Sequence, residues 1–406
     1  MDILIIPKQF CLEDMIAKIG FMKIITRFAP SPTGHMHIGN LKSVLLSYIL
    51  CKKKKGKFYL RIDNSDFLRS KMYNFKYIIK TLKWTKIKFN NKKNIIFQNK
   101  RKNIYLKEAI KLIIKKKAYY KNKAIKFKID KKKKVHWYEN KKKISFKNKT
   151  IEDFVIVRKN GMSTYNFATV IDDFYLKITH VLRGTEHINN TAKQINIIKS
   201  LKIKKVNYTH FSNFIKKNKK KISKRNKDYS IFNYKKNFFS NSIITYILNS
   251  CGKNYDKFCN LKFFIKNFKL QNLRKNPTVI NNKKILWYNK RYIKINFKKI
   301  YLKLKKNLRI YFFYFRNRIE KIKEIKKIKL KIEKLSFYIK KQNEYYLFLI
   351  NFFLKKIKNT KYIFYRKKFF KKNKYPIFLN VIFTKKTIKK KSSSSNGKDN
   401  TPSRCK

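Results

Sequence analysis

The stretch TRFAPSPTGHMHIGN, from Thr26 to Asn40, decides how the fold of this 406-residue chain is read. Just before and at its start, residues 23–28 are mostly apolar or β-branched, which favours a short strand. Two prolines then exclude a sheet ladder or a helix, and from Gly39 onward apolar residues recur at helical spacing. Loops between a strand end and a helix N-terminus bind phosphates in α/β folds. The stretch therefore predicts an α/β fold with a phosphate site at this loop.

The charge balance points to a polyanionic partner. The chain has 107 Lys and Arg against 20 Asp and Glu, a net charge of +87, and nucleic acid is the partner that such an excess favours. A compositional drift toward Lys, Asn, Ile, Phe and Tyr would also produce it, so charge alone identifies no site. Residues that resist the drift carry more weight, and the opening stretch holds two of the 8 glycines and two of the 6 prolines.

The cysteines favour a reducing compartment, and we expect a cytoplasmic protein. The five thiols show neither metal-ligand spacing nor a disulfide framework. No apolar run approaches the ~18 residues of a membrane span, so we expect no membrane contact, and Tyr345 to Leu354 is predicted to be a buried helix. Residues 1–21 resemble neither a secretory nor a transit peptide, and we expect a dispensable extension before a start at Met22.

A second informative block follows a lysine-rich segment. Residues 163–173 have helical spacing, and residues 178–187 read as a strand that ends in Arg-Gly, which suggests that the α/β sheet resumes here. Residues 191–201 predict a helix, and residues 220–225 form a basic loop with one serine. From about residue 240 the pattern is purely helical, with an apolar stripe from Ile322 to Ile339.

Two of these features suit ATP chemistry. His37 lies just ahead of a helix N-terminus, where an imidazole N–H and the helix dipole face phosphates, and Gly39 lets a flat ring approach the backbone. The basic loop supplies ammonium groups for a leaving pyrophosphate. Each feature alone is weak, because a single loop histidine is usually a surface residue and a lysine run is usually a solvated face.

Together the motifs resemble the class I aminoacyl-tRNA synthetases, specifically the glutamyl-tRNA synthetases. TRFAPSPTGHMHIGN is similar to the first ATP motif of the family, KISKR to its second, and STYNFATVIDD with ITHVLRGTEH to an amino-acid-binding segment; NPTVINNKKILWYNKRYIK resembles the start of its helical half. The implied fold is α/β, a Rossmann-type parallel sheet with an inserted acceptor-stem module, followed by an all-helical anticodon-binding half. The implied parts are an extension (1–21), the catalytic domain (22–95 and 163–210), the inserted module (96–162), a stem-contact region with the KISKR loop (211–290), the anticodon-binding region (291–390) and a disordered tail (391–406).

The resemblance also implies residue roles. Glutamate would be bound by Arg27, Ser31, Asp63, Tyr165 and Arg183. ATP would be bound by His37, Gly39, Asn40 and Lys224, and catalysis would rest on His37, Lys221 and Lys224. The implied reaction is attack of L-glutamate on the α-phosphorus of ATP, with Mg²⁺, and transfer of the glutamyl group from the adenylate to the 3′ end of tRNA(Glu). We expect a monomer. We also expect no zinc, because no cysteine lies between Cys51 and Cys251, the part of the chain that includes the insertion where some relatives carry it.

Several residues depart from the pattern. Asp63 is one methylene shorter than the usual Glu, Thr185 replaces an acid, and Thr169 is uncommon in the pocket. We expect Asp172 and Asp173, at a strand-to-loop edge, to orient other groups and not to bind a metal. For His136, His180 and His210 the sequence suggests no partners, and Trp287 and Tyr288 are predicted to be core residues.

Alternatives to the glutamate enzyme remain. A glutaminyl-tRNA synthetase would lack the Ala-Pro-Ser-Pro-Thr run, and a non-discriminating enzyme would also charge tRNA(Gln). A paralogue that modifies a tRNA base would lack the long helical part. A non-catalytic RNA-binding remnant would have lost the ATP motifs, which here are intact.

Overall fold

The computed structural model describes residues 23–66, 70–220, 222, 229–252, 254–255 and 257–340, with side chains up to residue 334. The chain divides into two compact units, Met1–Ile332 and Glu333–Lys406. The second contributes only the end of one helix to the described residues. The predictions for residues 1–21, the helix at Tyr345 to Leu354 and the tail from residue 391 therefore lie outside the described residues.

Short parallel strands build the central sheet, as the alternating pattern predicts. One piece has the order β1-β2-β3 and the other pairs β10 with β9, and every pair is parallel. The pieces meet where Thr179, just before β9, donates its backbone N–H to the Ile25 carbonyl at 3.0 Å. The strands are β1 (Ile25–Phe28), β2 (Lys57–Ile62), β3 (Ile96–Phe97), β9 (His180–Gly184) and β10 (Asn207–Phe211).

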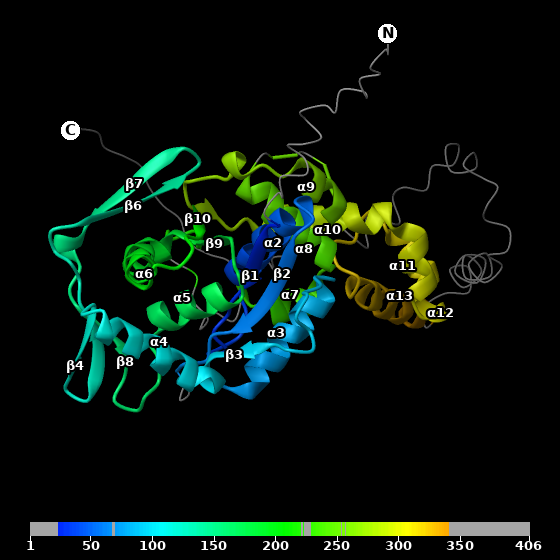
Figure 1. Ribbon diagram of the computed structural model, residues 1–406. Coiled ribbons are helices and arrows are strands. Elements are labelled where there is room, and N and C mark those ends of the chain that lie inside the picture. The colour runs from blue at the N-terminus through cyan, green and yellow to red at the C-terminus, as the bar shows by residue number, and fades with distance from the viewer. Residues whose placement is uncertain are drawn as a thin grey trace, which may run out of the picture. The chain divides into compact units, whose positions relative to one another are not determined.

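Helices cover both faces of this sheet. One hydrophobic core contains apolar side chains of β2, α2 and α8, and the other contains those of α4, α5 and α6. In Figure 1, α4, α5 and α6 lie to one side of β1 and β2, and α3, α7 and α8 to the other. The helices are α2 (Ile38–Lys53), α3 (Met72–Trp84), α4 (Lys102–Ile114), α5 (Tyr165–Tyr175), α6 (Ile188–Leu201), α7 (Ile231–Asn237) and α8 (Ser240–Cys251).

The lysine-rich segment forms small antiparallel sheets between α4 and α5. β5 pairs with β4 and β8, and β6 pairs with β7 in a long ribbon, at the upper left of Figure 1. The third strand of the parallel sheet, β3, begins at Ile96, so this sheet reaches past residue 95. The strands are β4 (Ala118–Lys121), β5 (Ala124–Phe127), β6 (Lys134–Glu139), β7 (Lys142–Lys147) and β8 (Phe154–Val157).

The last described part is helical with one exception. β12 (Thr278–Val279) pairs with β11 (Phe214–Ile215), so the expectation of a purely helical pattern after residue 240 is wrong at this point. Tyr288 is fully buried as predicted, whereas Trp287 is 38% exposed. The helices are α9 (Leu261–Asn267), α10 (Asn282–Ile295), α11 (Phe297–Lys303), α12 (Lys306–Phe315) and α13 (Glu324–Lys340). Among the described residues, no helix is long and apolar enough to cross a membrane.

Candidate active site

A row of basic side chains crosses the sheet near the carboxyl ends of its strands. The second-last residue is basic in four parallel strands: Arg27 in β1, Arg61 in β2, Arg183 in β9 and His210 in β10. All four contact a helix on the same face, because the first two reach Asp173 of α5 and the last two reach Thr191 of α6. Ligands of open α/β sheets bind outside this edge. The row therefore marks a candidate site for an anion.

Asp173 joins two of these arginines in a buried ion-pair network. Its carboxylate accepts from the Arg27 Nε at 3.1 Å and from the Arg61 Nη1 at 2.6 Å. Arg61 in turn donates to both oxygens of Asp63, at 2.7 and 3.1 Å. The side chains of these residues are at most 6% exposed. Buried charges are tolerated when they are paired and hydrogen-bonded, and here each guanidinium has a carboxylate.

Asp172 anchors the same helix to the start of α4. It accepts from the Arg101 Nε at 2.8 Å, from the Gln98 Nε2 at 3.0 Å and from the Tyr105 hydroxyl at 2.9 Å. Both aspartates lie in the last turns of α5, so the expected strand-to-loop edge is wrong. Arg61 lies near both, at 3.7 Å from the Asp172 Oδ2, but their hydrogen-bond partners differ, and both orient other groups as the sequence predicts.

The pKa values of the two carboxyls that pair with Arg61 are shifted in opposite directions. Burial raises the pKa of Asp63, and the attraction of Arg61 does not offset it. Burial also acts to raise the pKa of Asp173, but Arg27 and Arg61 outweigh it and hold that pKa below its ordinary value. Asp173 thus holds its charge more strongly than Asp63, and both arginines pair with it.

Polar groups without protein partners, two of them fully buried, lie on the elements that form the site. Within the described residues, neither Nη of Arg27 has a hydrogen-bond partner, since only its Nε contacts Asp173. The Arg183 Nη1 and the Thr169 Oγ1 are fully buried and also lack one. Buried polar atoms are normally satisfied. These groups therefore suit a ligand that brings its own acceptors, such as a carboxylate.

Tyr165, Arg183 and Arg27 belong to one electrostatic environment. The ring of Tyr165 lies 5.9 Å from that of His187. The pKa of His187 is lowered to about 4, first by burial and then by Arg183, with smaller contributions from His210 and Arg27. The charges of Arg183, Arg27 and Tyr165 also act on Tyr208, whose pKa is raised mainly by burial. Sequence-predicted residues from β1, α5 and β9 thus meet around these two side chains.

His37 forms the other side of the candidate site by capping α2. Its Nδ1 accepts from the Gly39 N–H at 3.1 Å, and its own N–H donates to the Asn40 Oδ1 at 3.0 Å, a reciprocal capping box. Because a backbone N–H can only donate, the proton of the neutral ring must be on Nε2. The predicted histidine therefore has a fixed tautomer at a helix N-terminus.

Gly39 allows this arrangement. A Cβ at this position would lie 3.0 Å from the Cε1 and the Nδ1 of His37. The glycine thus admits the flat ring of the histidine itself against the backbone. Ser31 is half-buried in the same loop, and the backbone N–H of Asp63 donates to the Pro30 carbonyl at 3.0 Å, which ties the loop to the end of β2.

Lys221 and Lys224 lie outside the described residues. The chain that follows them is held at the first motif, because Ser230 forms a β-bridge with His37 and Ile231 donates to the Met36 carbonyl at 2.8 Å. The described chain after the basic loop, at Ser230 and Ile231, therefore lies beside the histidine that caps α2.

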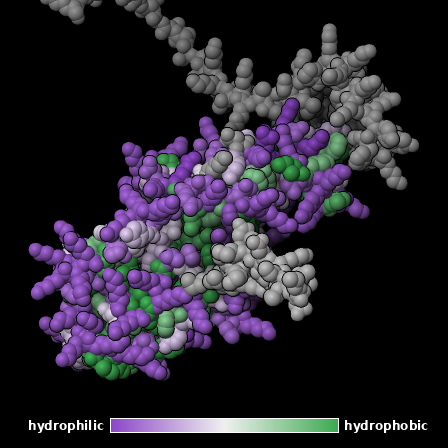
Figure 2. Space-filling view, turned by 45° about the horizontal axis from the view of Figure 1, so that its top comes forward, coloured by the Kyte–Doolittle hydropathy of each residue, from purple (hydrophilic) through white to green (hydrophobic). Residues whose placement is uncertain are grey.

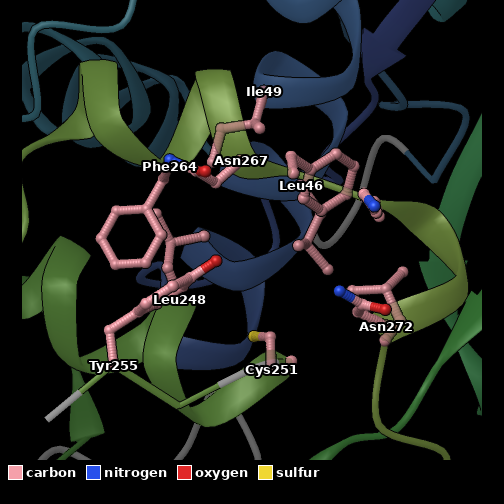
Figure 3. Close-up of a pocket in the computed structure, with 12 residues that line it drawn as sticks. Leu46, Ile49, Leu248, Cys251, Tyr255, Phe264, Asn267 and Asn272 are labelled. Atoms are coloured by element: carbon pink, nitrogen blue, oxygen red, sulfur yellow. The ribbon is translucent and has the colours of Figure 1, made fainter.

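A small cavity lies elsewhere, among α2, α8 and α9. Its volume is about 40 Å³, and it is lined by apolar side chains such as Leu46, Leu248 and Phe264 (Figure 3). Cys251 also lines it, and burial raises the pKa of this thiol. None of the predicted site residues contributes to it. We interpret it as a packing defect of the first core.

The sequence reasoning expected Asp173 to orient other groups but did not identify which ones, and it missed the other residues that hold the predicted ones in place. Arg61, Thr191, His210 and Glu139 each bind a site residue or its partner, over separations of up to 112 residues. One signal was available for Glu139, because the chain has only 20 acidic residues among 406. The rule that residues resisting the compositional drift carry more weight applies to these acids as it does to the glycines.

Comparisons with known proteins agree with this geometry. Residues 23–124 and 120–287 match the family described as tRNA synthetases class I (E and Q), catalytic domain. The glutamate–tRNA ligase of Buchnera aphidicola subsp. Acyrthosiphon pisum is 35% identical over 314 residues, 67% of this chain and 67% of the relative. That of Neisseria meningitidis serogroup A is 30% identical over 319 residues, 68% of this chain and 69% of the relative. The chain thus spans about two thirds of the length of these relatives.

A solved structure shows the same fold. The crystal structure of a glutamate tRNA ligase from Elizabethkingia meningosepticum, in complex with its amino acid, superposes with a TM-score of 0.68 at 22% identity and covers 76% of this chain and 80% of that one. The parallel sheet, the solved structure and the family match all indicate the same fold family. The chain belongs to the class I tRNA synthetases (E and Q).

Proposed function

We propose that this protein is a glutamate–tRNA ligase, which activates L-glutamate with ATP and transfers the glutamyl group to the 3′ end of tRNA(Glu). The single observation that carries the proposal is the orientation of Arg27. Asp173 holds its Nε, so the two Nη groups form a fork that has no partner among the described residues. A planar fork matches a carboxylate, which can accept two parallel hydrogen bonds.

In this proposal glutamate lies between β1, β2 and α5. Arg27 binds one carboxylate and Arg183 supplies its buried Nη1. Ser31 and Tyr165 line the same edge, and Asp63 faces the substrate ammonium. Asp63 can do so while paired, because a carboxylate has about four lone-pair positions and Arg61 uses two of them.

ATP lies at the N-terminus of α2. The Nε2–H of His37 donates to a phosphate oxygen, Gly39 admits the ring, and Asn40 fixes the cap. Lys221 and Lys224 stabilise charge that develops on the phosphates as the glutamate carboxylate attacks the α-phosphorus and pyrophosphate leaves. No covalent enzyme intermediate is needed, because positioning and charge stabilisation supply the rate.

Mg²⁺ enters with ATP in this scheme. Magnesium prefers carboxylate and phosphate oxygens, and the described residues contain no group of three or more His, Cys, Asp or Glu that could hold a metal. We propose a monomer that works in the cytoplasm. The free, buried thiols of Cys51, Cys251 and Cys259 support a reducing compartment.

We assign tRNA binding to the inserted module (96–162), the stem-contact region (211–290) and the anticodon-binding region (291–390). The β6–β7 ribbon buries Val135 and Trp137 and exposes lysines on its other face. Hydrophilic side chains cover most of the molecular face drawn in Figure 2. Phosphate contacts of this kind give affinity that falls steeply with salt.

The test is a charging assay with purified protein, ATP, tRNA(Glu) and tRNA(Gln), each with labelled glutamate and labelled glutamine. We expect glutamyl-tRNA(Glu), and pyrophosphate exchange that depends on tRNA. Charging with glutamine alone would contradict the glutamate assignment. Formation of glutamyl-tRNA(Gln) would establish the non-discriminating alternative. Binding of tRNA without any adenylate formation would establish the non-catalytic one.

A further inference from the structure

His210 lies between the inserted ribbon and the candidate amino-acid pocket. Its Nδ1 is 2.5 Å from the Glu139 Oε1 at the end of β6, and its Nε2 is 3.3 Å from the Arg183 Nε. The histidine side chain is 2% exposed and the glutamate side chain 11%. Glu139 and Arg183 are thus joined by a single buried ring, although they belong to different parts of the fold.

The protonation of this ring follows from Glu139. The carboxylate accepts from the Trp137 Nε1–H at 2.6 Å and from the His210 backbone N–H at 2.9 Å. An ionised carboxylate can only accept, so the Nδ1 of His210 must carry a proton. Three hydrogen bonds outweigh burial and hold the pKa of Glu139 below its ordinary value. The carboxylate is therefore ionised at neutral pH.

With the proton on Nδ1, Nε2 is an acceptor. It faces the Arg183 Nε–H and, at 2.9 Å, the Thr191 Oγ1. Thr191 also contacts the Arg183 Nη2 at 2.5 Å, and the Tyr208 ring lies 4.9 Å below the guanidinium. These contacts fix the plane of the guanidinium, and they leave the buried Nη1 as the group that has no partner within the described residues. The opposite tautomer would point an N–H at the Arg183 Nε–H.

We propose that Glu139 and His210 are positioning residues that set the orientation of Arg183, so that the β6–β7 ribbon forms a structural part of the amino-acid pocket. This inference rests on the proposed function for the identity of the substrate. A carboxylate that fixes a histidine tautomer is a general way to orient a neighbouring group. Here the oriented group is an arginine.

The sharpest variant is Glu139→Gln, which keeps the shape and removes one acceptor. Glutamine has one acceptor oxygen for the backbone N–H and the Nδ1–H of His210, so one of the two meets an N–H group. If the ring reprotonates on Nε2, it repels Arg183. We expect the KM for glutamate to rise roughly tenfold, the value for one lost hydrogen bond to a charged group. The KM for ATP and kcat should change less than twofold.

Glu152→Gln is the matched control. Glu152 belongs to the same inserted module, is exposed and has no hydrogen bond or ion pair among the described residues. The Glu152→Gln substitution makes the same change in net charge as Glu139→Gln, so any general effect on tRNA binding appears in both variants. Equal changes in the KM for glutamate and for ATP in Glu139→Gln would show a merely structural role and overturn the proposal.

A second measurement needs no activity. Nitrogen-15 NMR of the histidine rings distinguishes Nδ1–H from Nε2–H, and the His210→Asn variant assigns the signal. We expect Nδ1–H in the unaltered protein and loss of that tautomer in Glu139→Gln. A proton on Nε2 in the unaltered protein would overturn the positioning mechanism even if charging is observed. If the expected tautomers are observed but the protein does not charge tRNA with glutamate, the proposed function is contradicted and the positioning mechanism is not.

Discussion

The two sides of the candidate site are organised by different forces. On the amino-acid side, Arg27 and Arg61 depend on Asp173, which lies more than 100 residues away in sequence and is buried with them. On the ATP side, His37 is oriented by backbone and side-chain contacts with residues two and three positions further along. One side is held by long-range ion pairs, and the other by a local helix cap.

The two sides should therefore differ in how much a substitution destabilises the fold. A helix cap contributes about 0.5–2 kcal/mol, and its loss leaves no buried charge. Removal of one partner from a buried ion pair leaves the other charge uncompensated and costs about 3–5 kcal/mol. The amino-acid side is therefore part of the stability of the fold, whereas the ATP side can be altered with the fold intact.

Asp173→Asn should have the largest effect. It removes the ionised carboxylate that both arginines share, and we expect the free energy of unfolding to fall by about 3 kcal/mol. Urea denaturation of the full chain measures this. Asp130→Asn is the control, because Asp130 has an exposed partner in Lys133, and surface pairs contribute little. Equal stability of the two variants would disprove the structural role of the network.

Gly39→Ala should have a smaller effect, confined to the binding of ATP. The new Cβ would lie 3.0 Å from the imidazole, so the ring must leave its rotamer at a cost of about 0.5–1.5 kcal/mol. We expect the KM for ATP to rise roughly threefold to tenfold, with the KM for glutamate unchanged. Ser43→Ala, in the same helix, is the control. An unchanged KM for ATP would show that ATP binding does not depend on the position of the imidazole.

The smallest effect should be on pH dependence. The pKa of His187 is lowered to about 4, chiefly by burial, so below its ordinary pKa of 6.5 the unfolded chain takes up a proton that the folded chain does not. Stability should therefore fall as the pH drops from about 6.5 to 4. The slope should be shallow, because 34% of the side chain is exposed.

His187→Gln should reduce this slope without abolishing it, because burial also lowers the pKa of His180. Urea midpoints measured at pH 7, 5.5 and 4.5 give the slope. A steeper slope in the variant than in the unaltered protein would reverse the assigned sign.

The same contrast explains which features the sequence could predict. The strand, the helix and the histidine at its N-terminus were predicted from local pattern, because a cap and a 3.6-residue period are local properties. The position of Asp173 in α5 and the pairing of Glu139 with His210 were not predicted. Such pairs are set by how strands and helices from distant parts of the chain pack, and no spacing in the sequence encodes them.

The roles assigned to Lys221 and Lys224 come from the family resemblance and stay a prediction. Lys224→Ala should slow adenylate formation far more than it weakens tRNA binding, since its charge acts on the phosphates of the transition state. Rapid-quench measurement of adenylate and a tRNA binding titration compare the two. Equal losses would contradict the assignment.

The most direct test is to measure glutamate-dependent pyrophosphate exchange, with tRNA(Glu) present, in Arg27→Gln and His37→Gln side by side while glutamate and ATP are titrated. Loss of hydrogen bonds to a charged group costs about 1.5–3 kcal/mol. We therefore expect Arg27→Gln to raise the KM for glutamate by roughly tenfold to a hundredfold and to leave the KM for ATP unchanged. His37→Gln should lower the rate of exchange and raise the KM for ATP, with the KM for glutamate unchanged. If both variants change the two KM values in the same proportion, the division of the site into an amino-acid side and an ATP side is wrong.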